Sequence, residues 1–151
     1  MSVPLRWPTP SDAGTQLEPL MPVSSWNGLE EGALQGVRVL VVEDNGQVAA
    51  ALASVLIDMG MTVTGPAATS HEAERLTIAQ SPELALVDLN LGGEQAVHLI
   101  EWLLQRKLRV IVMSGMAILP KMVSNDAAFL QKPFGTDELF AAMRQEMLAA
   151  A

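Results

Sequence analysis

The stretch "LALVDLNLGG" (residues 84–93) places one carboxylate, Asp88, in an apolar run and follows it with two glycines. A run of Leu, Ala and Val bounded by turn residues is typical of a strand that is buried on both faces. An ionised side chain is costly in such a strand unless something pairs with it. We therefore expect Asp88 at the carboxyl end of a buried strand, where the chain leaves the sheet.

Apolar runs of strand length alternate with helical patterns on both sides of this stretch. The predicted strands are residues 37–42, 61–65, 83–88, 109–115 and 127–131, and the predicted helices are residues 48–59, 69–80, 94–106 and a last helix from Thr136. Thr69 and Glu72 have the spacing of a capping box at the start of the second helix. This alternation predicts an α/β fold, a doubly wound five-stranded parallel sheet with helices on both faces.

The composition limits the classes of function. The chain has 151 residues, enough for one domain with a real core, and a formal net charge of −8. An acidic chain does not fit direct nucleic-acid binding, which needs clustered Lys and Arg. The absence of cysteine excludes a disulfide framework. Because the N-terminal residues form no apolar segment, we expect no signal peptide or membrane span, and a cytoplasmic location.

The composition changes near Gly36. Five of the nine prolines, Pro4, Pro8, Pro10, Pro19 and Pro22, lie in residues 1–36. We therefore divide the chain into a Pro-rich extension, 1–36, and a folded domain, 37–151. Residues 27–30, "NGLE", predict a capping box that opens a short helix through Leu34. Two interpretations of the extension stay open: a mobile tail, or a segment that packs through Trp7 and Trp26 on the domain or on a second copy.

Polar residues follow four of the predicted strands: Glu43 and Asp44 the first, Asp88 the third, Ser114 the fourth and Lys132 the fifth. The carboxyl ends of parallel strands meet at one edge of the sheet, where ligands bind. Three neighbouring carboxylates repel one another unless a cation lies among them, and hard oxygen ligands suit Mg²⁺. A carboxylate nucleophile, a divalent ion, a hydroxyl and an ammonium are the groups that an aspartyl phosphate requires.

With "VVEDN" at residues 41–45, "VDLNLGG" at 87–93, "VMSG" at 112–115 and "FLQKPF" at 129–134, the chain resembles the response-regulator receiver (CheY-like) domains of two-component signalling over residues 37–151. The resemblance implies a flavodoxin-like three-layer sandwich in which Asp88 is the phosphoacceptor and Ser114 and Lys132 contact the phosphoryl group. It implies Mg²⁺ held by Glu43, Asp44, Asp88 and the backbone carbonyl of Asn90. It also implies a cis peptide between Lys132 and Pro133.

The same resemblance implies partners in a phosphorelay. The phosphoryl donor would be a histidine kinase or a histidine phosphotransfer protein. Catalysis would be limited to Mg²⁺-dependent self-phosphorylation and slow autodephosphorylation, so the chain is not expected to be an enzyme in the ordinary sense. Because no second domain is predicted after the receiver, we expect the signal to pass by contact with a downstream protein target.

The sequence departs from the family between the fourth and fifth strands. Ser114 and Lys132 are 132 − 114 = 18 positions apart, shorter than is usual by about one helical turn. Pro120 further weakens a helix in this segment. The usual dimer through this region cannot be assumed, although a homodimer stays open. Phe129 lies at the family's aromatic switch position, beside the switch residue Ser114, and has no hydroxyl, so its switching would be by packing alone.

Other functions fit fewer of the residues. An aspartyl-phosphate phosphatase of the haloacid dehalogenase type requires a second Asp two residues after the nucleophile, where this chain has Asn90. A nucleotide-binding enzyme requires a Gly-rich loop after the first strand, and "EDNGQ" (43–47) has one glycine. A degenerate receiver that acts as a phosphorylation-independent binding module remains as an alternative. His71 and His98 lie at no strand end and are expected to be ordinary surface or packed side chains.

Overall fold

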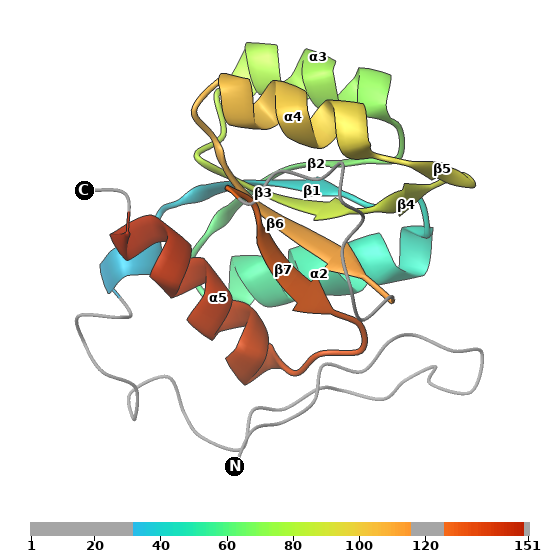
Figure 1. Ribbon diagram of the computed structural model, residues 1–151. Helices are drawn as coiled ribbons and strands as arrows, with labels where there is room; N and C mark the ends of the chain where they lie inside the picture. The colour runs from blue at the N-terminus through green and yellow to red at the C-terminus, as the bar shows by residue number, and fades with distance from the viewer. Residues whose placement is uncertain (1–31, 116–125, 150–151) are drawn as a thin grey trace.

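The computed structural model describes residues 32–115 and 126–149. Its centre is a parallel sheet of five strands in the order β2-β1-β3-β6-β7 (Figure 1). The strands are β1 (Arg38–Val42), β2 (Thr62–Ala67), β3 (Leu84–Asp88), β6 (Arg109–Ser114) and β7 (Ala128–Gln131). The predicted doubly wound fold is therefore confirmed, and the apolar runs form the sheet because a parallel sheet is covered on both faces.

Helices cover both faces of the sheet (Figure 1). The helices α2 (Gly46–Asp58) and α5 (Thr136–Leu148) lie on one face, and α3 (Ser70–Gln80) and α4 (Val97–Gln105) lie on the other. Side chains of one strand alternate between the two cores: Val39 and Val41 of β1 pack with α2 and α5, whereas Leu40 and Val42 pack with α3 and α4. This period of two explains why each central strand is apolar throughout.

Side-chain caps precede the helices α2 and α3. The side chain of Asn45 accepts hydrogen bonds from the backbone N–H groups of Gln47 and Val48, so α2 begins at Gly46, two residues before the predicted start. The Thr69 hydroxyl accepts from the Glu72 N–H at 3.1 Å, as the capping-box spacing predicts. Each cap satisfies N–H groups that have no partner inside the helix.

The predicted helix over residues 94–106 was wrong at its beginning. Residues Glu94–Gln95 form a short strand, β5, which pairs antiparallel with β4 (Asn90–Leu91), and α4 begins only at Val97. Gly92 and Gly93 form the turn with φ of 59° and 87°. A two-residue type I′ turn requires positive φ at both positions, which the Gly-Gly pair provides. A β-hairpin therefore lies between Asp88 and α4.

The second strand differs from its prediction by a shift toward the C-terminus. β2 spans Thr62–Ala67 and includes Pro66, whose peptide bond with Gly65 is cis. β2 is an edge strand of the sheet, the place where a strand tolerates a proline because one side of the backbone has no strand to pair with.

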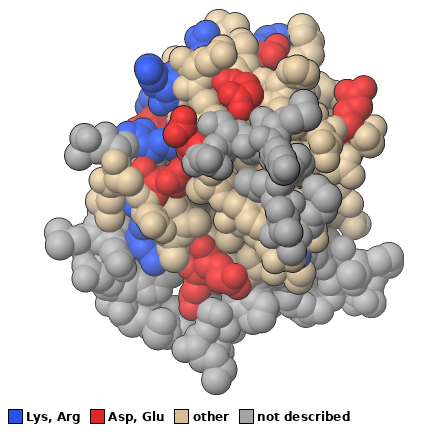
Figure 2. Space-filling model, viewed as in Figure 1, with Lys and Arg blue, Asp and Glu red and all other residues tan. Residues whose placement is uncertain are grey.

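Several predictions fall outside the described residues: the "NGLE" capping box, the packing of Trp7 and Trp26, and the weakening of a helix by Pro120 between the fourth and fifth strands. Gly32, Ala33 and Leu34 are helical, and Leu34 is buried in the core on the α2 and α5 face. Within residues 32–115 and 126–149, no helix is long and apolar enough to cross a membrane. On the described part of the face in Figure 2, acidic and basic side chains are interspersed.

Candidate functional site

The fold brings the five predicted polar residues to one edge of the sheet. Glu43 and Asp44 follow β1, and Asp88 is the last residue of its neighbour β3. Ser114 ends β6, the next strand in the sheet, and Lys132 follows β7 at the edge. Because all five strands are parallel, these residues share the carboxyl edge, where parallel sheets bind their ligands.

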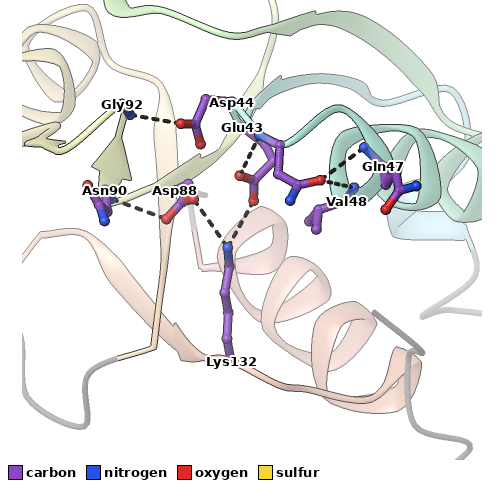
Figure 3. A network of polar contacts seen from close by, with 9 residues as sticks. Glu43, Asp44, Gln47, Val48, Asp88, Asn90, Gly92 and Lys132 are labelled. Carbon is purple, nitrogen blue, oxygen red and sulfur yellow. Dashed lines mark hydrogen bonds and ion pairs between the residues drawn. The ribbon is translucent and has the colours of Figure 1, made fainter. Parts of the chain in front are cut away.

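Lys132 contacts the two buried carboxylates of this group (Figure 3). Its ammonium donates to Glu43 Oε1 at 2.9 Å and to Asp88 Oδ2 at 3.2 Å. The backbone N–H of Lys132 donates to the carbonyl oxygen of Ser114 at 2.7 Å, and the Lys132–Pro133 peptide is cis, as the resemblance implies. The backbone of the lysine is thus held by β6, and its side chain by Glu43, which follows β1, and by Asp88 of β3.

Consecutive acidic residues after β1 point in different directions (Figure 3). Glu43 is buried and points to Lys132, whereas Asp44 is exposed and its Oδ2 accepts the Gly92 N–H at 2.8 Å. This continues the alternation of the strand, in which neighbouring residues face opposite sides of the sheet. The pair therefore connects the site to both β7 and the β4–β5 hairpin.

Glu43, Asp44 and Asp88 form an acidic cluster, each offering a carboxylate oxygen within 4.8 Å of the others. Asp88 Oδ1 also accepts the Asn90 N–H, and Glu43 Oε2 accepts the Asn45 N–H, both at 3.2 Å. A cluster of hard oxygen donors with one exposed member fits a Mg²⁺ ion that keeps several of its waters. The donor chemistry of the cluster is thus compatible with the predicted metal.

Burial sets the electrostatics of the cluster. Desolvation raises the pKa of Glu43 to about 7, and the hydrogen bond from Lys132 offsets only part of that effect, while neighbouring Asp88 adds to it. Burial acts to lower the pKa of Lys132, but its hydrogen bond to Glu43 and the charge of Asp88 outweigh burial and raise it. Lys132 therefore remains an ammonium, while Glu43 exchanges its proton near neutral pH.

A cleft opens beside Asp88 at this edge. It is lined by Asp88, Leu89, Asn90, Gly93, Gln95, Ser114 and Gly115. Ser114 is buried, with 4% of its surface exposed, and Asp88 is 7% exposed. The cleft is therefore a route by which a small anionic group could approach the Asp88 carboxylate beside the Ser114 hydroxyl.

Not every predicted residue belongs to this polar network. Phe129 is half-buried on β7, where it is paired with Val112 of β6. The Asn90 backbone reaches Asp88 through its N–H, and His71 and His98 are exposed on α3 and α4. The sequence analysis missed Gly92 as a donor to Asp44. The signal that could have revealed the hairpin was the Gly92-Gly93 pair, because two adjacent glycines between short extended segments favour a two-residue hairpin turn.

Several solved structures similar to this chain are of PhyR proteins and of response regulator receiver domains. The crystal structure of the anti-anti-sigma factor PhyR from Bartonella quintana is 22% identical over 80% of this chain and 51% of that chain, with a TM-score of 0.70. The solution structure of the PhyR receiver domain from Erythrobacter litoralis is 23% identical over 78% of this chain and 94% of that chain, with a TM-score of 0.69. The present chain spans about half the length of the PhyR crystal structures that it matches.

A third similar structure is the response regulator TrrA from Thermotoga maritima in complex with Mg²⁺ and BeF. It is 20% identical over 73% of this chain and 98% of that chain, with a TM-score of 0.66. No curated protein matches the chain in sequence. Residues 39–144, most of the chain, match the family model described as "Response regulator receiver domain", and the chain therefore belongs to the family of response regulator receiver domains.

Proposed function

We propose that this receiver domain takes a phosphoryl group on Asp88 from a phosphohistidine of a histidine kinase or a histidine phosphotransfer protein. The observation that carries the proposal is the position of the Asp88 carboxylate. It lies 3.2 Å from the Lys132 ammonium and within 4.8 Å of the Glu43 and Asp44 carboxylates. Such an arrangement provides a nucleophile, a cation and a set of metal ligands at one strand end.

The transfer replaces one bond to phosphorus by another. An Asp88 oxygen forms a bond to the phosphorus as the bond from phosphorus to the donor imidazole nitrogen breaks, and the electron pair of that bond stays on the imidazole. Lys132 and the Ser114 hydroxyl would donate to the phosphoryl oxygens. A bound Mg²⁺, held by Glu43, Asp44, Asp88 and the Asn90 carbonyl, would supply further neutralisation of the negative charge.

The signal would then pass to a downstream protein by contact. The Lys132 N–H donates to the Ser114 carbonyl, and Phe129 lies on β7, the strand at the edge of the sheet next to β6. A movement of Ser114 toward a phosphoryl group would therefore be transmitted to the strand that carries Phe129. Since Phe129 has no hydroxyl, the change it transmits is one of packing. A homodimer that forms in the phosphorylated state is one form that this output could take.

The decisive experiment is labelling with a small phosphodonor. Wild-type protein, Asp88→Asn and the exposed-carboxylate control Asp58→Asn are incubated with radiolabelled acetyl phosphate and Mg²⁺. We expect label on the wild type and on Asp58→Asn, and none on Asp88→Asn. Label that persists on Asp88→Asn would place the acceptor elsewhere. Wild-type protein that binds Mg²⁺ but takes no label, even from histidine kinases, would favour the phosphorylation-independent binding module.

A further inference from the structure

The β4–β5 hairpin is hydrogen-bonded to the site through β4 and through its turn. The N–H of Asn90 donates to Asp88 Oδ1 at 3.2 Å, and the N–H of Gly92 at the turn donates to Asp44 Oδ2 at 2.8 Å. At the base, the N–H of Ala96 donates to the carbonyl oxygen of Leu89. The hairpin backbone is therefore held in place relative to the Asp88 carboxylate.

The register of the hairpin turns Gln95 toward the cleft. Asn90 pairs directly with Gln95, and Leu91 pairs with Glu94. Directly opposed residues in an antiparallel pair lie on the same face, and the next pair lies on the other. Leu91 faces the core beneath the hairpin, so Asn90 and Gln95 face away from it, and both line the cleft that also contains Asp88 and Ser114.

The side-chain amide of Gln95 can form hydrogen bonds beside an anion without repelling it. Gln95 is exposed, so water reaches it, and its amide both accepts and donates hydrogen bonds without adding a charge that would repel an anion. Glu94, its neighbour, belongs to the opposite face and does not line this cleft; it lines a second hollow with Thr69 and His71 at the start of α3, which Gln95 also borders. Of these two adjacent residues, the uncharged one is at the proposed phosphoryl site.

We propose that Gln95 orients the water that hydrolyses the acyl phosphate on Asp88, and so sets the lifetime of the phosphorylated state; this inference rests on the proposed function. The water oxygen forms a bond to phosphorus as the bond from phosphorus to the Asp88 oxygen breaks. The electrons of that bond return to Asp88 as a carboxylate. The products are inorganic phosphate and one proton, which passes to solvent. Gln95 holds the water through its amide oxygen and takes no proton itself, as glutamines do in other phosphoryl transfers.

The test separates loss of the phosphoryl group from its uptake. Wild type, Gln95→Met, Gln95→Ala and the control Glu94→Met are labelled with radiolabelled acetyl phosphate and Mg²⁺, the donor is removed, and the decay of the label is followed. We expect the lifetime to lengthen about fivefold in both Gln95 variants, the change that loss of one neutral hydrogen bond in a transition state produces. Uptake rates, Mg²⁺ affinity and the lifetime in Glu94→Met should remain those of the wild type.

Three results would overturn the inference while leaving the proposed function intact. The first is an unchanged lifetime in the Gln95 variants. The second is a longer lifetime in Gln95→Met alone, which would indicate shielding by the new side chain. The third is a fall in uptake or Mg²⁺ affinity parallel to the longer lifetime, which would assign Gln95 to building the site. A wild-type protein that takes no label from acetyl phosphate or from histidine kinases would overturn the proposed function, and this inference with it.

Discussion

The Lys132 ammonium lies closer to Glu43 than to Asp88, 2.9 Å from Glu43 Oε1 against 3.2 Å from Asp88 Oδ2. Glu43 is the more deeply buried of the two carboxylates, with a side chain 2% exposed against 10% for Asp88. A buried carboxylate depends strongly on its counter-ion, because water does not replace the lost partner. The lysine therefore competes with any cation that would bind the acidic cluster.

Lys132→Met should separate metal binding from phosphoryl uptake. Without the ammonium Glu43 binds its proton more tightly, so Mg²⁺ affinity should rise only at a pH at which Glu43 is ionised, where the metal alone neutralises Glu43 and Asp88. Uptake from acetyl phosphate should fall by about 100-fold, the effect of removing one donor to a developing anion. Isothermal titration and labelling measure the two quantities. Arg75→Met, an exposed cation on α3, should change neither. A parallel fall of both in Lys132→Met would mean that the lysine only holds the site together.

The pH dependence of Mg²⁺ binding should follow the ionisation of Glu43. Its pKa of about 7 means that the metal-free site holds a proton on Glu43 over much of the range below neutrality, and a metal must displace that proton. Affinity should therefore rise between about pH 6 and pH 8 and level off above. Titrations in two buffers of different ionisation enthalpy should detect the released proton. In Glu43→Gln the affinity should be weaker and its rise with pH smaller. An affinity in the wild type that is constant over this range would contradict the assignment of Glu43 to the metal.

The same pKa makes a prediction for the stability of the metal-free protein. Burial raises the pKa of Glu43 from 4.5 to about 7, so the folded state holds the proton more tightly than the unfolded state does. That contribution to stability is complete below the unfolded pKa and is lost as the pH rises through the folded pKa. Between about pH 5 and pH 8, wild type should lose roughly 3 kcal/mol more stability than Glu43→Gln. Urea unfolding with a chelator present measures the difference, and the α3 control Glu72→Gln should follow the wild type.

The position of Asp88 was predictable because two independent constraints agree on it. A strand covered on both faces must be apolar, and the first charge after such a run marks its end. The sharing of one edge by Glu43, Asp44, Asp88, Ser114 and Lys132 then follows from parallel topology alone. Both constraints act on buried strands, where few residue types other than apolar ones are tolerated.

The hairpin was missed because its residues carry no comparable constraint. Glu94 and Gln95 are good helix formers, and the apolar spacing of α4 begins immediately after them. Two short strands of two residues each also have too little alternation to indicate a sheet. The contact between Gly92 and Asp44 spans 48 positions and depends on backbone angles at the turn, which a pattern of residue types does not specify. The division of roles between Glu43 and Asp44 was likewise hidden, since adjacent acids are equivalent until a strand gives them opposite directions.

Substitutions at Gly92 should test whether the hairpin turn is required to position Asp44. Gly92 has a φ of 59°, and an added Cβ would meet nothing within 4 Å, so the backbone angle rather than space limits what fits. Asn accepts this angle readily at the first position of a type I′ turn, whereas a β-branched residue does not. Gly92→Asn should keep the melting temperature and Mg²⁺ affinity of the wild type. Gly92→Val should cost about 1–2 kcal/mol, a fall of several degrees in melting temperature, and should weaken Mg²⁺ binding because the N–H that holds Asp44 moves.

The control for this comparison is Gly32→Val. Gly32 is exposed, has no positive φ, and an added Cβ there also meets nothing within 4 Å, so the variant adds the same side chain without the conformational cost. Thermal melts with and without Mg²⁺ separate the conformational cost of the valine from the loss of metal binding. If the turn positions a metal ligand, the variant binds Mg²⁺ more weakly and is stabilised less by it, so the difference in melting temperature from the wild type is larger when Mg²⁺ is present. If Gly92→Val and Gly92→Asn melt alike and bind Mg²⁺ alike, the turn does not constrain Asp44. A loss of melting temperature in Gly92→Val that is larger with Mg²⁺ than without it, and absent from Gly92→Asn, would show that the hairpin and the acidic cluster form one unit.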